Sequence, residues 1–442
     1  MRIGDLESAG VRLAAITMVD TAGITRVKIV PLRRLETVAR NGVGYSNLWA
    51  AVAGNDRFAP VAPWDSPSGD MRLVPDLEAL QPLAAAPGYA WAPVRQLDQE
   101  LGVMPSCQRS LVERIVAKAA ATGLSFQLTT ELEMTLLRAG GGEPAHHGPG
   151  YSTQALVPIE RFTLELCDAL EAQGIPVEQL HPEFSPGQFE VSTAPADPVS
   201  AADRLVLLRI TARQVAAAHG YDVSFAPVVL PGAVGNGAHL HLSAWRNGRN
   251  LCTGGTGAGG LTPEGASAMA GIVEHLPSLM AILAPTVPSY LRLQPGHWAG
   301  AFTCFGVENR EAALRFIPGT ISSRSQSANV EVKVTDGAAN PYLAVAVVIA
   351  AALDGIERGL PEPPNVLVDP ASLTDDEQRK LGVRRLPATL AAATDGFEAS
   401  ALMRQTLGDA YHAAVVGSKR LEWATYGEAD AELVAAEHRF RY

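Results

Sequence analysis

The sequence lacks the patterns that mark several common classes of protein. Its four cysteines are scattered and form no C-x-x-C pair, so neither a disulfide framework nor a zinc site is predicted. It has no basic run, and its net charge of −11 argues against nucleic acid as the main partner. Its longest apolar run, 344–353, is too short to span a membrane, and charged Asp5 and Glu7 replace an apolar signal core. We therefore expect a cytoplasmic protein that binds neither nucleic acid nor membranes.

What the sequence does contain is a series of acidic and histidine residues in stretches that alternate polar and apolar residues. This alternation is typical of half-buried β-strands. It occurs at 127–136, 188–192, 238–243 and 329–334. The acidic and imidazole residues on the polar faces are Glu131, Glu133, Glu190, His239, His241 and Glu331. Glu183 stands seven residues before Glu190. The pattern predicts one sheet whose polar face lines an acidic cavity.

Such a cavity implies cations. A single E-x-E strand is usually a solvated face, but four strands of this kind would gather several carboxylates on one surface. Without cations those carboxylates would repel one another strongly. Oxygen-rich sites with one imidazole suit Mg²⁺ or Mn²⁺ better than Zn²⁺. The sequence therefore predicts a Mg²⁺ or Mn²⁺ site.

The first hundred residues differ from the rest. Residues 11–30 indicate two strands joined by a turn at 21–23, and the proline-rich stretch 60–93 has little helical pattern. Helices and strands alternate after residue 105. We expect helices at 110–121 (capped by Ser110), 161–172, 201–218, 266–283 and 340–356. The chain is predicted to be α+β, with a β-rich domain at 1–100 and a larger domain at 101–442.

The ordered set of motifs resembles the glutamine synthetase superfamily over nearly the whole chain. The motifs are ELE at 131–133, EFSPGQFE at 183–190, NGAHLHLS at 236–243, NREAALR at 309–315, VEVK at 330–333 and NPYLA at 340–344. The resemblance implies a β-grasp-like domain at 1–100 and a catalytic domain at 101–442. In the catalytic domain, helices would flank a curved antiparallel sheet. It also implies a homo-oligomer, either a hexameric ring or a dodecamer.

The resemblance assigns roles to individual residues. Two or more Mg²⁺ or Mn²⁺ ions would be held by two sets of ligands: Glu133, Glu183 and Glu190, and Glu131, His239 and Glu331. The positions that match ATP contacts are Glu178, His241, Ser243, Arg310 and Arg315. Arg310 and Arg315 would also act in catalysis by neutralising the transferred γ-phosphate. They have opposite strand parity, so a bulge or turn must separate them. The substrate-binding positions are Gly235, Arg292 and Lys333.

Departures from the family pattern concern the nucleophile and the acid. Trp298 stands where ammonia-using members carry a catalytic glutamate, and no aspartate occurs in 41–54, where those members have one near the ammonium. Lys333 replaces an arginine that grips the α-carboxylate, and Val234 replaces an asparagine. An ammonium ion therefore loses the negative groups that would bind and deprotonate it. A Trp face, in contrast, can hold an organic ammonium group.

The hypothesis is an ATP-dependent ligase, similar to the γ-glutamylpolyamine and other γ-glutamyl-amine ligases. It would join the glutamate γ-carboxylate to a polyamine or small alkylamine through γ-glutamyl phosphate. One alternative is glutamine synthetase itself, which uses ammonia, and a second is a non-catalytic structural homologue. The histidine pair 146–147 and the glycine-rich stretch 253–260 are expected to be loops without a metal or phosphate site.

Overall fold

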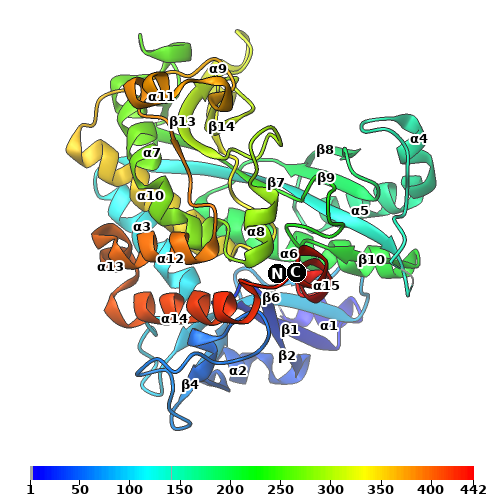
Figure 1. The fold of residues 1–442 in the computed structure, drawn as a ribbon. Coiled ribbons are helices and arrows are strands. Elements are labelled where there is room, and N and C mark those ends of the chain that lie inside the picture. Colours follow the sequence, from blue (N-terminus) through cyan, green and yellow to red (C-terminus); the bar gives the residue numbers. More distant parts are fainter. Residues whose placement is uncertain (1–2, 141) are drawn as a thin grey trace.

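A computed structural model of the protein describes residues 3–140 and 142–442, which form two sheets with helices packed around them (Figure 1). The smaller sheet has the order β2-β1-β6-β4-β3, and β5 pairs with β6. Its strands are β1 (Leu13–Val19), β2 (Thr25–Pro31), β3 (Val43–Ser46), β4 (Asp70–Pro75), β5 (Gln81–Pro82) and β6 (Tyr89–Leu97). The predicted strands and turn at 11–30 are confirmed as β1 and β2.

The smaller sheet has its own apolar core. Helices α1 (Ile3–Ser8) and α2 (Leu35–Asn41) contribute buried Leu6, Leu35 and Val38, which pack with apolar residues of the strands. β1 and β6 run parallel, whereas the other pairs in this sheet are antiparallel. A mixed sheet covered by a short helix agrees with the expected β-grasp-like arrangement. The domain boundary at residue 100 stays a prediction.

The larger sheet positions the acidic residues. Its order is β16-β13-β14-β15-β11-β7-β9-β8, with β10 on β7 and β12 on β11. Its strands are β7 (Leu124–Arg138), β8 (Val177–Pro182), β9 (Gln188–Thr193), β10 (Tyr221–Ser224), β11 (Ala238–Arg246), β12 (Arg249–Asn250), β13 (Phe302–Val307), β14 (Ala312–Ile317), β15 (Asn329–Val332) and β16 (Arg384–Arg385). The four strands predicted from alternation, β15, β11, β7 and β9, are neighbours in that order.

The expected antiparallel sheet has one exception among the described strands, because β13 and β14 run parallel. The connection 308–311 returns the chain to the start of β13 and places Ala312 beside Phe302. A tight hairpin would instead have reversed the strand direction.

The helices expected from the sequence are all present. They are α3 (Gln108–Ala120), α5 (Glu160–Ala172), α6 (Pro198–Ala218), α7 (Pro263–Leu283) and α10 (Pro341–Arg358). Ser110 does not cap α3, because the helix begins two residues earlier, after Cys107. The other helices are α4 (Thr153–Leu156), α8 (Val287–Arg292), α9 (Arg324–Ser327), α11 (Asp375–Leu381), α12 (Leu390–Ala399), α13 (Ala401–Leu407), α14 (Asp409–Tyr426) and α15 (Ala431–His438).

Helix α7 is a core helix. Within the described residues it alone is long and apolar enough to cross a membrane by length and composition, yet 72% of its apolar window is buried inside the protein. It packs against α10 and α12. Its apolar surface is therefore covered by other parts of the same chain.

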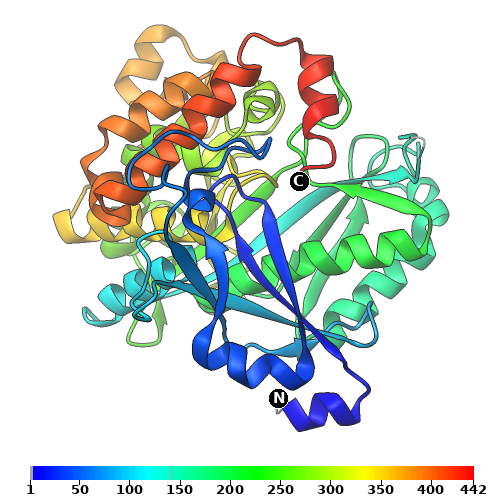
Figure 2. The same ribbon diagram turned by 90° about the horizontal axis from the view of Figure 1, so that it is seen from below.

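The turn at 20–23 between β1 and β2 contacts residues that lie outside the smaller sheet, Asn340 and Tyr442. Figure 2 shows the N-terminal strands in front of the larger sheet, with α14 running alongside. The side chain of Asn340, which caps α10, donates to the carbonyl of Asp20 at 2.9 Å. The hydroxyl of Tyr442 donates to the carbonyl of Ala22 at 3.0 Å. Buried backbone carbonyls of the turn are thus satisfied by residues from the far end of the chain.

Candidate active site

Strand register brings the predicted acidic and histidine residues together. His239 on β11 lies opposite Glu131 on β7, and His241 lies opposite Glu331 on β15. Residues that face each other across neighbouring strands have side chains close together on one face of the sheet. Glu133 on β7 is likewise paired with Glu190 on β9. The side chains that alternate along each strand are therefore gathered into one compact cluster by the pairing of the strands.

This cluster lines a cavity of about 520 Å³. Twelve of the predicted site residues contribute to its wall: Glu131, Glu133, Glu183, Glu190, Gly235, His239, Arg292, Trp298, Arg310, Arg315, Glu331 and Lys333. Three do not line it in the described part of the chain, namely Glu178, His241 and Ser243. Glu178 is exposed on β8, and its neighbour Gln179 lines the cavity instead. Ser243 is buried and accepts a hydrogen bond from Trp245 at 2.8 Å.

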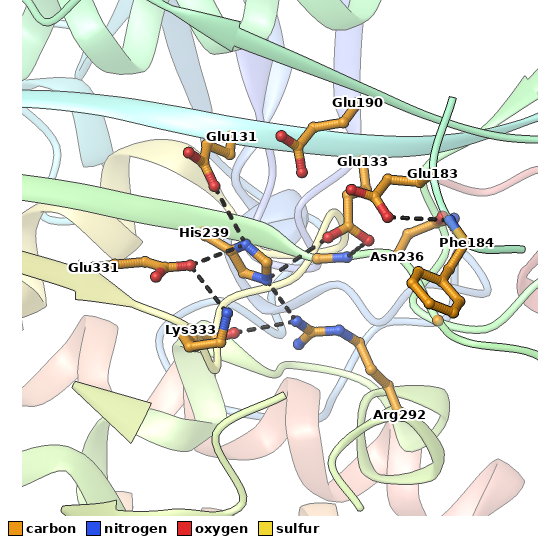
Figure 3. A network of polar contacts seen from close by, with 12 residues as sticks. Glu131, Glu133, Glu183, Phe184, Glu190, Asn236, His239, Arg292, Glu331 and Lys333 are labelled. Atoms are coloured by element: carbon orange, nitrogen blue, oxygen red, sulfur yellow. Dashed lines mark hydrogen bonds and ion pairs between the residues drawn. The ribbon is translucent and has the colours of Figure 1, made fainter. Parts of the chain in front are cut away.

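His239 lies at the centre of the cluster (Figure 3). Its Nδ1 atom is 3.2 Å from Glu331 Oε1 and 3.7 Å from Glu131 Oε2. Its Nε2 atom is 3.7 Å from Glu133 Oε1. His241 sits behind this group, with Nε2 3.3 Å from Glu131 Oε1 and Nδ1 2.9 Å from Asn329 Oδ1.

Within the acidic cluster, three sets of described side chains have donor atoms close enough to share one ion. In each set the atoms all lie within 4.8 Å of one another. The sets are Glu131, Glu190 and His239; Glu131, His241 and Glu331; and His181, Glu183 and Glu190. Carboxylate oxygens with imidazole are a donor set that Mg²⁺ and Mn²⁺ accept. The residues present therefore fit divalent ions, although the groupings differ from the two ligand sets that the family resemblance implies.

The charges of these groups perturb one another. Burial and the repulsion of Glu131 and Glu133 raise the pKa of Glu190 to about 9. Burial also opposes ionisation of Glu131, but the charges and hydrogen bonds of His241 and His239 lower the pKa of Glu131 below its ordinary value. A carboxyl group kept protonated by neighbouring carboxylates is a place where a cation would relieve repulsion.

Glu331 is held by two cations of the protein. Lys333 Nζ lies 3.0 Å from Glu331 Oε1, and Arg315 Nη1 lies 3.1 Å from Oε2. Although burial opposes ionisation, Lys333 and the two histidines lower the pKa of Glu331 to about 2. Lys333, predicted to bind the substrate carboxylate, thus has its ammonium group on a predicted metal ligand.

Arg292 and Gly235 form the opposite part of the wall. Arg292 is buried, and its Nη2 atom contacts His239 Nε2 at 3.1 Å and the carbonyl of Lys333 at 3.1 Å. A side chain at Gly235 would place Cβ 2.2 Å from the carbonyl of Pro227 and 3.0 Å from Arg292 Cγ. Glycine at this position therefore allows the backbone to approach Arg292 closely.

The two arginines of NREAALR reach the cavity from different elements. On one continuous strand they would point to opposite faces, because they are five residues apart. Arg315 lies on β14, whereas Arg310 lies on the connection 308–311 and is exposed. Both line the cavity. Glu308, also on that connection, pairs with Arg315 at 2.8 Å.

Several residues at the site received no role in the sequence analysis. Gln188 is buried and donates to Glu133 Oε2 at 2.9 Å and to the carbonyl of Gly235 at 3.1 Å. Its position on the polar face of the predicted strand was the available signal. His146, expected to lie in a loop, is buried, and its Nε2 is 3.0 Å from the carbonyl of Gln188.

An aromatic group borders Glu183. Tyr151 donates to Glu183 Oε1 at 2.5 Å and stacks on His181 with ring centroids 5.1 Å apart. His181 Nε2 is 3.2 Å from the same oxygen. No local pattern marks Tyr151, because it follows a glycine-rich connection and reaches the cavity only through the tertiary fold.

Trp298 stands at the mouth of the cavity. It is 52% exposed and meets Phe184 edge to face, with ring centroids 6.1 Å apart. Tyr151 and Phe184 are also more than half exposed, at 58% and 57%. The mouth thus presents aromatic side chains, whereas the floor presents carboxylates and imidazoles.

The fold and the cavity together define a family. Models of the glutamine synthetase N-terminal domain and of the glutamine synthetase catalytic domain match residues 2–104 and 105–436. The chain therefore belongs to the glutamine synthetase family. This is a family of ligases, and a cavity that suits metal ions and is lined by several arginines agrees with such an activity.

The chain is similar to several individual members of this family and to solved structures. The chain is 46% identical to the γ-glutamylpolyamine synthetase GlnA3 of Streptomyces coelicolor, over 99% of this chain and 95% of that protein. It is 30% identical to the glutamine synthetase of Mycobacterium tuberculosis, over 95% and 94% of the two chains. It resembles the crystal structure of a novel glutamine synthase homologue with a TM-score of 0.88, 33% identity and coverage of 98% and 99%. It also resembles the structure of GmaS in complex with ADP, with a TM-score of 0.85, 29% identity and coverage of 98% of this chain and 97% of that chain.

Proposed function

We propose that this protein is an ATP-dependent ligase that joins the γ-carboxylate of glutamate to an organic amine. The observation that carries the proposal is Trp298, an exposed indole at the mouth of an acidic cavity. The family pattern has a glutamate at this position in members that use ammonia. The name of the Streptomyces relative, a γ-glutamylpolyamine synthetase, supports the same choice of nucleophile.

The chemistry begins with the acid. A carboxylate is a poor electrophile, so its oxygen first attacks the γ-phosphorus of ATP, which gives γ-glutamyl phosphate and ADP. Arg310 and Arg315 line the cavity as guanidinium groups suited to the charge on the transferred phosphoryl group. Bound Mg²⁺ or Mn²⁺ would supply further charge neutralisation, held by the six carboxylate and imidazole residues that the sequence predicts. Arg292 supplies a cation for the substrate carboxylate.

The second step attaches the amine. A bound alkylammonium first gives one proton to a carboxylate of the cavity or to water. The neutral amine nitrogen then attacks the acyl carbon, phosphate leaves, and the second proton released from nitrogen passes to the phosphate or to water. An alkylammonium group gains contacts with the face of Trp298 that an ammonium ion cannot match with its smaller surface. A polyamine or small alkylamine is therefore the proposed substrate.

The decisive experiment measures phosphate release with ATP, glutamate, Mg²⁺ and a panel of ammonium, small alkylamines, ethanolamine and polyamines. An organic amine should give the highest kcat/KM. If ammonium gives the highest value, the proposal fails and glutamine synthetase activity replaces it. Glu133→Ala and Glu190→Ala should abolish turnover, as should excess chelator. Full activity under either condition would contradict the metal assignment.

Three further points complete the proposal. The chain is divided near residue 100 into an N-terminal and a catalytic domain, it works in the cytoplasm, and it assembles into a homo-oligomeric ring. Exposed Val27 and Ile29 on β2 support assembly, since they leave an apolar face on the smaller sheet. Light scattering on the purified protein tests the ring, and a fully active monomer would contradict it.

A further inference from the structure

Behind the mouth of the cavity lies a buried carboxylate that the chemistry above does not use. Glu311 is 7% exposed and follows Arg310 on the connection before β14. Its Oε1 atom accepts the backbone N–H of Trp298 at 3.0 Å. Its Oε2 atom is buried and has no hydrogen-bond partner among the described residues. Burying a carboxyl oxygen without a partner costs free energy, so the position of Glu311 calls for an explanation.

The group that Glu311 holds is in an unusual conformation. Trp298 has φ +52°, in the left-handed region that large side chains rarely adopt. Gly296, two residues earlier, has φ +76°. A tryptophan in this region persists only where surrounding contacts fix it, whereas glycine adopts a positive φ without strain. The hydrogen bond from the Trp298 N–H to the buried side chain of Glu311 is such a contact.

Glu311 is itself anchored on the side away from the cavity. Its backbone N–H donates to Asn309 Oδ1 at 3.0 Å. The amide of Asn309 donates in turn to the carbonyls of Val366 and Val368, at 2.8 Å and 3.0 Å. The connection 308–311 is thus tied to a separate segment of the chain, which gives Glu311 a fixed place from which to hold the loop.

We propose that Glu311 is a positioning residue that fixes the loop 296–299 and thereby sets the shape of the amine-binding mouth. Residues 296–299 all line the cavity, whereas Glu311 does not, so it acts through Trp298. Release of the Trp298 N–H would let the indole leave its edge-to-face position on Phe184. The inference rests on the proposed function in one respect, that the mouth receives the amine.

The test uses Glu311→Ala, Glu311→Asp and Glu311→Gln. The alanine variant should raise KM for the best amine about tenfold, and KM for ATP and glutamate should stay within about twofold. The shorter aspartate side chain should behave like alanine, because it withdraws the acceptor by one methylene. Glutamine keeps an oxygen acceptor and should largely restore the wild-type KM. Glu362, which accepts the N–H of Ala258 at 2.8 Å outside the cavity, supplies the matched control Glu362→Ala.

A second readout needs no turnover. Acrylamide quenching of Trp298 fluorescence, isolated by subtracting the Trp298→Phe variant, should increase in Glu311→Ala and Glu311→Asp but not in Glu362→Ala. Unchanged quenching with unchanged amine KM overturns the inference. An equal loss in every kinetic constant, with a lower melting temperature, also overturns it, because that result marks a merely structural residue. If alanine prevents folding, the aspartate and glutamine variants decide. A wild-type enzyme that uses no organic amine refutes the proposed function, while the quenching result still decides the role of Glu311.

Discussion

In the proposed function, the preference for an organic amine over ammonia depends above all on Trp298. Replacement by glutamate removes the aromatic face and adds a proton acceptor at the mouth of the cavity. We expect Trp298→Glu to lower kcat/KM for the best organic amine by about 2- to 30-fold, the range that a cation–π contact spans. The same change should raise the use of ammonium.

Steady-state kinetics on wild type, Trp298→Glu and Trp298→Phe measure this effect. The phenylalanine variant is the control, because it retains an aromatic face and the apolar packing against Phe184. If the glutamate variant keeps the amine preference of wild type, Trp298 only packs beneath the loop.

Glu190 should give the metal-free protein a characteristic pH dependence. Its folded pKa of about 9 lies above the ordinary 4.5, so the folded protein keeps a proton that the unfolded chain releases. Stability in chelator should therefore fall as pH rises between about 4.5 and about 9. Mg²⁺ displaces that proton, so the rise in melting temperature on adding Mg²⁺ should be larger near pH 8.5 than near pH 6.

Thermal melts with Mg²⁺ and with chelator at the two pH values check this sign. Glu190→Gln cannot ionise, and it should lessen the decline that wild type shows in chelator. The remaining decline comes from His241, because, although burial opposes this, Glu131 raises the pKa of His241 to about 9. A wild-type protein that gains stability with rising pH over this window would contradict the assignment.

At the scale of elements, α10 depends on a cap that serves two parts of the molecule. Asn340 accepts the N–H groups of Tyr342 and Leu343 and donates to the carbonyl of Asp20. Asn340→Ala should lower the free energy of unfolding by about 2 kcal/mol, because both the cap and a buried bond are lost. Thr389→Ala removes only the cap of α12 and should cost about 1 kcal/mol.

Urea unfolding of the two alanine variants gives the comparison directly. Equal losses would show that the bond from Asn340 to the turn at 20–23 adds nothing to the stability. The activity of both variants should remain, since neither residue lines the cavity in the described part of the chain.

The elements that the sequence predicts best are the strands carrying the acidic residues. On β7, β9, β11 and β15 one physical rule, the alternation of side chains across a sheet, fixes both the strand and the face. Loops have no comparable rule. The positive φ of Trp298, the contact of Tyr151 with Glu183 and the place of Glu311 all depend on distant parts of the chain. The parallel pairing of β13 and β14 escaped prediction for the same reason, because the path of the connection 308–311 decides it.

Site roles differ in the same way. Most of the predicted residues on strands line the cavity, although Glu178, His241 and Ser243 do not. Lys333 lines the cavity and contacts Glu331, and its role at the substrate carboxylate stays a prediction. A lysine ammonium has no directional fork, so its partner is set by the nearest carboxylate and not by the motif. Glu178 carries a role only from the family resemblance, and its exposure on β8 leaves that role a prediction.

At the scale of the whole molecule, the N-terminal and C-terminal parts should fold together. The turn at 20–23 buries Thr21, whose hydroxyl donates to the carbonyl of Ala50 at 2.7 Å and contacts the hydroxyl of Tyr411 at 3.1 Å. A fragment of residues 1–104 would expose this turn and lose its partners from the rest of the chain, Asn340, Tyr411 and Tyr442. We expect that fragment to lack cooperative thermal unfolding, as followed by circular dichroism. A sharp transition in the isolated fragment would contradict this expectation.

The bond between Tyr442 and Ala22 also constrains how the protein can be made. The two residues are 420 positions apart, so the turn at 20–23 cannot gain this partner until those intervening residues have been synthesised. Until then the carbonyl of Ala22 lacks the hydroxyl that covers it in the finished protein. The N-terminal strands can pair early, yet their junction with the catalytic part is completed only once Asn340 and Tyr442 have left the ribosome. Translation that stops short of α14 should therefore leave an open, protease-sensitive N-terminal segment.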